Sequence, residues 1–475
     1  MKIGFLNIVP WKGHHSHVKF LMECAKRNSH TVHYLSCGGG RRHCYQKLVN
    51  HRLFECQYCI IKNRVTALSS NHQVTCKVVG QQPTDGMASE KFSASVISSV
   101  GSALRKERDD WIDFATDNEL KLLKSTEQDF RNITNEYLRT FSEHKYDFLF
   151  IFNGRFHDVA AAIKAAKKLN IPFATHERAW FGRGLQINLN TDCLSLKYGH
   201  YDKNINYSDQ DLEHAKDLVE RRINNGIKGE WKVYNQSRSS LDAQSVSTKY
   251  KGKYLVIPSS RSEFLGHSDF ELNDENSLVT LDKLLEFYNI NTQEVIVRGH
   301  PAWTSKIGHN ELSESAQEYR SWCVDNGATF IEPDDSSVST YELMLVSKLG
   351  IFNGGSAVIE AVHLRLPCVA LSKAHYISGS FVTDLSGAKG SWPATLPREV
   401  KESDLLDVYK YVHFRYRHQV TFFNHVFANA STKYSYNIDQ SCLREFEAIV
   451  SMGKMGMLSD AAYSVDREKN VYYSK

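Results

Sequence analysis

The sequence has no long apolar run and no dominant charge. Its apolar runs are short, such as Phe148–Phe152, whereas a membrane-spanning helix needs ~20 residues. The 58 Lys and Arg residues nearly balance the 54 Asp and Glu residues, and the formal charge of +4 is too small to indicate a nucleic-acid partner. No secretory signal is visible, because Met1 leads directly into the strand-like stretch KIGFLNIV. We therefore expect a cytoplasmic protein that binds no nucleic acid.

Length and composition are those of a globular protein with more than one domain. The chain has 475 residues, of which 41% are apolar and 24% are charged, enough for two domains with full cores. Strand-like and helix-like segments alternate, which predicts an α/β fold built on parallel sheets. A capping pattern at Ser208 and Asp211 predicts a helix that continues through Arg222. The polar segment 235–252 then suggests a boundary between a first domain, 1–245, and a second, 246–400.

The stretch around Val295–Val297 predicts a buried parallel strand. It ends in Arg298, Gly299, His300 and Pro301. Ligands of open α/β sheets lie beyond the carboxyl ends of the strands. Arg298 and His300 are therefore expected to donate to a bound anion.

A second strand, 348–352, leads into a glycine loop. Asn353 is followed by Gly354 and Gly355, and we predict that a helix opens at Ser356. Such a loop presents backbone N–H groups and a positive dipole end, which suit a phosphate. Glycine loops also occur without a ligand in doubly wound domains. The convergence of this loop with the preceding strand end favours a nucleotide site.

Other side chains of the second half complete this predicted site. Ser259 and Ser260 follow the strand 254–257 and can donate to phosphate. Glu263 can accept from a ribose or sugar hydroxyl, and we include it among the catalytic candidates. A serine-rich loop that caps the next element is the alternative interpretation.

Two further residues suit the nucleoside. Glu360, one turn into the predicted helix, suits the two ribose hydroxyls, because a carboxylate would repel phosphate. Tyr341, at the start of a helix after DDSSVST, can pack on the base.

The first domain offers candidate bases. After the opening strand, the segment 10–17 reads PWKGHHSH and is predicted as a loop. An imidazole there can take a proton from an acceptor hydroxyl. His14 is the favoured base, and His17 is a candidate for substrate binding. Hydrogen-bonded surface histidines are the alternative.

Two later strand ends of the first domain are also polar. Asn153 and Arg155 follow the strand 146–152, and Glu177 and Arg178 follow the strand 172–175. Neighbouring strand ends share one edge of a sheet, so these residues are expected to meet. Glu177 is the second candidate base, and the other three are candidates for substrate binding. A structural ion pair is the competing interpretation.

Ten cysteines fit a reducing compartment. Cys37, Cys44, Cys56 and Cys59 are closely spaced, and four thiolates can hold zinc or an iron–sulfur cluster. Cys76 can replace one of them. The spacing is not that of a standard zinc finger, and free buried cysteines are the other interpretation.

The order of these motifs resembles the C-terminal half of the bacterial capsule polysaccharide synthesis glycosyltransferases. The FNGR, HER and SSRSEF stretches are similar to the same family. The resemblance implies the GT-B fold, in which two Rossmann-like domains face a cleft and a C-terminal segment, here 401–475, packs back on the first domain. Related His-Pro pairs meet the donor phosphate in bacterial sialyltransferases and Kdo transferases, which assigns phosphate contacts to His300 and Ser356. Gly299 and Ala357 depart from the family pattern.

We therefore expect a metal-independent glycosyltransferase of capsule or other surface polysaccharide synthesis. Its partners would be a nucleotide sugar, with CMP-sugars favoured by the His-Pro pair, and a glycan acceptor that can be lipid-linked. The alternatives are a nucleotide-sugar epimerase, a CDP-polyol phosphotransferase and a non-catalytic glycan-binding subunit. The aromatic and basic segment 409–427 suits either burial, which we favour, or peripheral contact with the inner face of a membrane.

Overall fold

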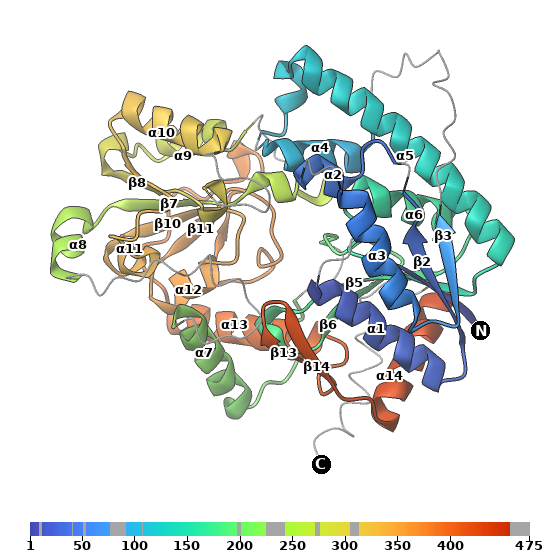
Figure 1. The fold of residues 1–475 in the computed structure, drawn as a ribbon. Helices are drawn as coiled ribbons and strands as arrows, with labels where there is room; N and C mark the ends of the chain where they lie inside the picture. The colour runs from blue at the N-terminus through green and yellow to red at the C-terminus, as the bar shows by residue number, and fades with distance from the viewer. Residues whose placement is uncertain are drawn as a thin grey trace.

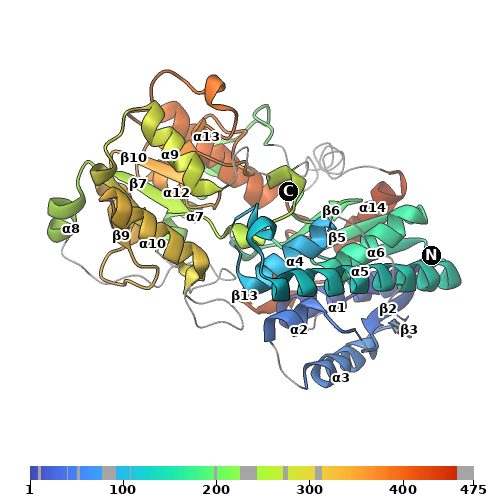
Figure 2. The same ribbon diagram turned by 90° about the horizontal axis from the view of Figure 1, so that it is seen from above.

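The fold consists of two α/β units, each built on a six-stranded sheet with helices on both faces (Figures 1 and 2). The computed structural model describes residues 1–8, 12–39, 41–50, 54–76, 92–106, 108–196, 201–224, 243–270, 276–304 and 313–456. No helix within these ranges is long and apolar enough to cross a membrane. The predicted α/β fold class with two Rossmann-like sheets is confirmed.

The first sheet has the strand order β3-β2-β1-β4-β5-β6. Its neighbours are parallel except for β5 and β6, which are antiparallel. This is the order of a Rossmann-type sheet, which reverses between β1 and β4. The strands are β1 (Lys2–Leu6), β2 (Thr31–Cys37), β3 (His72–Cys76), β4 (Phe148–Phe152), β5 (Phe173–Arg178) and β6 (Leu185–Leu189).

Two layers of helices bury both faces of this sheet, which explains why β4 is apolar at every position. Phe148 and Phe150 face a core that includes α1 and the C-terminal helix α14. Leu149 and Ile151 face a second core with α4, α5 and α6. The helices are α1 (Lys12–Arg27), α2 (Tyr45–Asn50), α3 (Glu55–Ala67), α4 (Ala94–Leu104), α5 (Asp117–His144) and α6 (His157–Lys168).

The second sheet repeats the same topology. Its order is β12-β11-β10-β7-β8-β9, all parallel, so that the reversal lies between β7 and β10. Its strands are β7 (Tyr254–Pro258), β8 (Val295–Arg298), β9 (Thr329–Ile331), β10 (Leu349–Asn353), β11 (Cys368–Ala370) and β12 (Thr383–Asp384). One face packs on α9 (Ser277–Phe287) and α10 (Glu314–Asn326), and the other on α8 (Ala243–Tyr250), α11 (Thr340–Val346) and α12 (Val358–His363).

The remaining elements tie the two units together. Helix α7 (Asp209–Ile223), which the predicted limits assign to the first domain, packs on α12 and on α13 (Glu402–His413). The chain then forms the hairpin β13 (Val426–Ala430) and β14 (Lys433–Tyr436) and ends its described part in α14 (Gln440–Lys454). Helix α14 packs against α1, the edge strand β6 and its neighbour β5. The exact domain limits stay a prediction from the sequence.

The aromatic segment 409–427 is largely buried. Tyr411, Phe414, Tyr416 and Phe422 are inaccessible or nearly so, and the first three join the core that α7 and α12 share. A π-helical turn, Phe414–His418, carries two of them. In the structure this segment is therefore packed inside the fold, as the favoured interpretation expected.

Short 3-10 helices occupy several connections between the sheets and the helices. They are η1 (Trp111–Phe114), η2 (Trp180–Gly182), η4 (Arg261–Glu263), η5 (Ser268–Phe270), η6 (Thr292–Glu294), η7 (Pro301–Trp303) and η8 (Lys389–Ser391).

Arg41 and Asp158 form a buried ion pair whose loss we expect to destabilise the first domain. The Arg41 guanidinium donates to Asp158 Oδ1 at 2.7 Å and to the Tyr137 hydroxyl at 3.0 Å. Arg41→Ala should lower the free energy of unfolding by about 3–5 kcal/mol, because it leaves a buried carboxylate unpaired. Urea denaturation followed by circular dichroism measures the change. The control is Arg27→Ala, which breaks an exposed pair with Glu23 and should cost a small fraction of that. Equal losses would contradict the prediction.

Candidate functional site

The strand-order reversals mark where a ligand can bind in each unit. At a reversal, the connections leave in opposite directions and open a crevice beyond the carboxyl ends of the two central strands. In the first unit these ends lead into Asn7, after β1, and Asn153, after β4. In the second they lead into Ser259, after β7, and Gly354, after β10. The predicted site residues cluster around these four positions.

The two crevices face each other. Arg155, just beyond β4, donates to the backbone oxygen of Glu263, just beyond β7. Close by, Arg105 donates to the backbone oxygen of Ala302 at 2.8 Å. Arg261 pairs with Asp109 at 2.6 Å across the same boundary. The carboxyl edges of both sheets therefore meet, and Arg155 and Glu263 lie where they meet.

His14, Glu177 and Asn153 form one cluster on the first unit. The Nδ1 atom of His14 lies 3.3 Å from Glu177 Oε1. The Asn153 amide donates to Glu177 Oε2 at 2.8 Å, and the backbone N–H of Arg178 donates to Oε1 at 3.0 Å. The side chains of His14 and Glu177 are only 16% and 21% exposed. The predicted meeting of these strand ends is thus observed for Asn153 and Glu177, whereas the Arg155 side chain turns to the backbone oxygen of Glu263.

The predicted loop at 10–17 is wrong over its described part. Helix α1 begins at Lys12, so that His14, His15 and His17 occupy its first turns. His14 and His17 are three residues apart and share a helix face, and their rings form an edge-to-face pair at 5.9 Å. Being on a helix, His14 is held more rigidly than a loop residue would be. Residues 10 and 11 of this segment lie outside the described residues.

The surroundings of His14 and Glu177 lower the pKa values of both side chains. Burial lowers the pKa of His14, and Arg178 adds to the effect while Glu177 opposes it. For Glu177, burial alone would raise the pKa, but His14, Arg178 and the hydrogen bond from Asn153 together lower it. At neutral pH the imidazole is therefore neutral and the carboxylate is ionised. A neutral imidazole beside an ionised carboxylate suits a general base.

His17 and His176 lie deeper, beneath this cluster. Both are fully buried, and within the described residues their ring nitrogens have no hydrogen-bond partner. His17 packs edge-on against Tyr434 at 4.5 Å. Burial lowers the pKa of His176 to about 3 and that of His17 well below its usual value. His17, which the sequence predicted as a substrate ligand, is therefore a buried packing residue beneath the cluster.

His300 and Pro301 begin the short helix η7. The Nδ1 atom of His300 accepts from the backbone N–H of Ala302 at 3.2 Å, which fixes the ring at the end of β8. The side chain is half-buried. Its placement at a carboxyl strand end agrees with the predicted phosphate contact, which stays a prediction.

Arg298 is buried and engaged in the fold. Its guanidinium donates to the backbone oxygens of Glu332 at 2.6 Å and Asp335 at 3.0 Å. These contacts hold the loop before α11, the helix that carries Tyr341. Burial lowers the pKa of Arg298, with Asp335 and Asp334 opposing. In this structure Arg298 organises the loop, and its predicted contact with phosphate stays a prediction.

The glycine loop lies at the reversal of the second sheet. Gly354 and Gly355 have φ of +84° and +74°, which only glycine adopts readily. Ser259 donates to the backbone oxygen of Asn353, and a Cβ on Gly354 would lie 2.9 Å from Ser259 Oγ. The buried Ser260 hydroxyl is instead bonded to Ser262 at 3.0 Å.

The helix after this loop begins later than predicted. Helix α12 starts at Val358, and Ser356 and Ala357 form a turn before it. The helix is short, ending at His363. Gly355 is exposed and Ser356 is half-buried, so the loop is open to a ligand.

Arg222 is a residue that the sequence did not reveal. It comes from α7, and its guanidinium lies 3.0 Å from Glu360 Oε1 and donates to Ser356 Oγ at 3.0 Å. It also lies over the rings of Trp180 and Phe181. One arginine thus holds both the predicted phosphate ligand and the predicted ribose ligand. No local motif marks it, because the contact joins positions 134 residues apart.

A small polar pocket lies between the units, beside the second crevice. Its lining includes Arg108 from the first unit and Ser259, Arg261, Ser277, Trp303 and Glu318 from the second. Asn353, next to the glycine loop, donates to Ser277. The pocket therefore continues the crevice toward the first unit. Arg108 and Arg261 were not among the predicted site residues.

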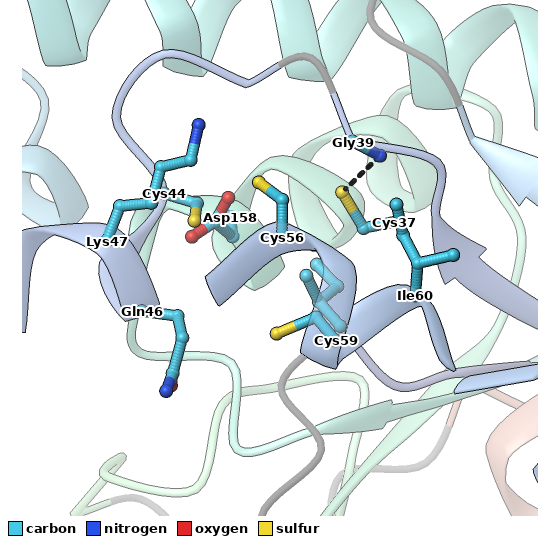
Figure 3. Close-up of a pocket in the computed structure, with 10 residues that line it drawn as sticks. Cys37, Gly39, Cys44, Gln46, Lys47, Cys56, Cys59, Ile60 and Asp158 are labelled. Carbon is cyan, nitrogen blue, oxygen red and sulfur yellow. Dashed lines mark hydrogen bonds between the residues drawn. The ribbon is translucent and has the colours of Figure 1, made fainter. Parts of the chain in front are cut away.

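The four clustered cysteines surround a different pocket. Cys37, Cys44, Cys56 and Cys59 all line it, as Figure 3 shows, but their sulfur atoms are spread around it and not turned toward one point. Within the described ranges, no three His, Cys, Asp or Glu side chains are grouped to hold a metal ion. Burial raises the pKa of the Cys44 thiol, which disfavours the thiolate that a metal needs. A zinc or iron–sulfur site stays a prediction from the sequence alone.

Comparisons with known proteins give only distant likenesses. No family model matches the chain, and no curated protein matches it. Among solved structures, a UDP-GlcNAc 2-epimerase from Methanocaldococcus jannaschii, in complex with UDP-GlcNAc and UDP, is 12% identical with a TM-score of 0.26, covering 86% of this chain and 98% of that one. KpsC of Thermosulfurimonas dismutans, a beta Kdo 2,7 transferase, is 11% identical with a TM-score of 0.32, covering 58% and 80%. The epimerase and Kdo transferase activities are those of the two neighbours.

The buried histidines predict acid-sensitive stability. His176 stays neutral in the folded chain down to about pH 3, whereas in the unfolded chain it takes up a proton below about pH 6.5. The unfolded state then binds more protons, so stability is complete above pH 6.5 and falls as the pH drops below it, by up to about 1.4 kcal/mol per pH unit for each such histidine. Urea unfolding between pH 8 and pH 5 measures this slope. His176→Phe should make the slope shallower, whatever its effect at pH 8, and an unchanged slope would contradict the assignment.

The Arg222 contacts predict a second effect on stability. Arg222→Ala should lower the free energy of unfolding by about 3–5 kcal/mol, because the buried Glu360 carboxylate loses its partner. The neighbouring Arg221 offers a matched control, since it pairs with Asp217 on the exposed side of α7. Arg221→Ala should therefore change stability little. Thermal unfolding of both variants measures the difference, and similar losses would refute it.

Proposed function

We propose that the protein is a metal-independent glycosyltransferase of surface polysaccharide synthesis. It would move a sugar from a nucleotide-activated donor to a hydroxyl of a glycan acceptor. CMP-sugars are the favoured donors. The observation that carries this proposal is the contact of Arg155 with the backbone oxygen of Glu263. Through it, the reversal points of two Rossmann-type sheets face each other, and one crevice can bind each substrate.

The second unit would bind the donor. The open glycine loop at Gly354 and Gly355 offers backbone N–H groups to phosphate, and His300 would add a donor from the neighbouring strand end. Ser356 and Glu360 are already held in place by Arg222. Such preset groups stabilise the charge that develops on the leaving phosphate without having to reorganise. Tyr341 suits the base, whereas the buried Glu360 carboxylate, predicted to meet the ribose hydroxyls, is engaged by Arg222 and would support Ser356 from beneath.

The first unit would bind the acceptor and remove its proton. His14 is neutral at pH 7, because burial lowers its pKa, and can accept the proton of an attacking hydroxyl. Glu177 faces Nδ1 of the ring at 3.3 Å and would stabilise the imidazolium that forms. Asn153 fixes Glu177 in turn. This arrangement favours a transferase, because it provides a base on the unit opposite the donor loop.

Nucleotide binding and sugar transfer can be tested separately. In a thermal-shift screen with CMP, CDP, UDP and GDP, the bound nucleotide at 100 times its Kd should stabilise the chain by ~2.7 kcal/mol. His300→Ala should abolish this shift. His14→Asn should keep the shift but lower the rate of sugar transfer by about 10²–10⁴-fold, the usual contribution of a general base. His30→Asn, at a peripheral pair with Glu447, should change neither.

The reaction without acceptor distinguishes the alternatives. A transferase leaves the nucleotide sugar intact or hydrolyses it slowly, whereas an epimerase converts the sugar while it stays attached to the nucleotide. Epimerised product would replace the transferase proposal. Loss of the nucleotide shift in His14→Asn, or its persistence in His300→Ala, would refute the assignment of donor and acceptor sides.

A further inference from the structure

Helix α3 presents an unusual apolar stripe to solvent. The exposed fractions along it are large, namely Phe54 75%, Tyr58 49%, Ile61 62%, Val65 56% and Leu68 84%. These positions are spaced by four, three, four and three residues, which places them on one side of a helix. The other exposed large apolar residues of the described chain are scattered over different elements. Figure 2 shows α3 at the outer edge of the first unit.

The stripe is not a core face turned outward by a shift of the helix. The opposite side of α3 is well anchored, because the Tyr34 hydroxyl of β2 donates to Asn63 Oδ1 at 2.7 Å. Asn63 and Thr66 are buried on this side. A surface helix normally turns its polar residues to water. An apolar stripe that is kept outside by a polar anchor inside marks a contact surface.

Basic residues outnumber acidic ones along the stripe. From residue 54 to residue 68, the charged residues are Glu55, at the first helical position, and the basic Lys62 and Arg64. The Lys62 ammonium lies 4.6 Å from the centre of the Tyr58 ring, so that a cation sits at the border of the apolar stripe. The surface complements one that is apolar and negatively charged.

We propose that α3 docks the protein on an anionic lipid surface. The five apolar side chains would enter the boundary between headgroups and acyl chains, and Lys62 and Arg64 would contact the lipid phosphates, as in helices that lie in the plane of an interface. This proposal does not depend on the proposed reaction.

A second copy of the chain fits this surface less well. Stable dimers bury about 800 Å² on each partner, with roughly 20–30 residues a side, whereas the stripe offers five side chains along α3 and its two cap residues, Phe54 and Leu68. Pairing two copies along the stripe would also bring the same basic flanks together. A lipid surface needs neither a large area nor a matching shape, and its charge is opposite.

Vesicle flotation of the full chain tests the proposal. The protein should float with vesicles that contain phosphatidylcholine and phosphatidylglycerol, and only weakly with pure phosphatidylcholine. The double variant Ile61→Ser, Leu68→Ser should lower the partition coefficient by about tenfold or more. The double variant Lys62→Glu, Arg64→Glu should remove the preference for anionic vesicles. Val324→Ser, Leu345→Ser, at two exposed apolar positions of the second unit, should bind like the parent.

Three results would overturn the proposal. The first is a parent chain that floats with neither kind of vesicle. The second is a parent that light scattering shows to be dimeric while Ile61→Ser, Leu68→Ser is monomeric, which would assign the stripe to a second copy. The third is a fall in the Tm of that variant with unchanged flotation, which would mean that another part of this chain covers the stripe.

Discussion

The strand order of the two sheets is the constraint on which the rest of the structure depends. Each sheet reverses its order once, between β1 and β4 and between β7 and β10. A reversal leaves a crevice that no connection can fill. Because Arg155 joins one reversal to the other through Glu263, the two crevices become the two walls of one site. The chemistry of the site then depends on which polar side chains follow those four strands.

Burial and neighbouring groups set the protonation states of these polar side chains. His14 and Glu177 lie together in a largely enclosed place, and the neighbouring Arg178 charge and Asn153 hydrogen bond keep the carboxylate ionised. The same enclosure keeps His14, His17 and His176 neutral. The predicted acid lability of the first unit and the neutral state of His14 are thus two consequences of one arrangement. A more exposed cluster would be more stable in acid but would hold its base less firmly.

Local patterns in the sequence were sufficient for much of the fold. The run FLFIF predicts β4 because both faces of the sheet are covered, and the capping pattern at Ser208 and Asp211 correctly marks the start of α7. Polar residues near strand ends identify Asn153, which follows β4, and Glu177, which lies in the last residues of β5, because their meeting follows from the parallel sheet. The sequence placed the end of β5 at 175, whereas the strand continues to Arg178. The early start of α1 and the late start of α12 were missed, since helix ends depend on a few weak contacts. Arg222 was missed for a different reason: its partners are distant in sequence, and only tertiary packing brings them together.

The contacts of Arg222 also show how the glycine loop is connected to the rest of the molecule. Helix α7 carries Arg222 and packs on α13, and the chain after α13 returns to α1 through the hairpin and α14. The first turns of α1 carry His14. A displacement of either unit must therefore pass through elements that touch both the glycine loop and the base. Since packed elements move as bodies and deform little, the positions of the glycine loop and of His14 are set jointly through the C-terminal segment, whose Tyr434 also packs against His17.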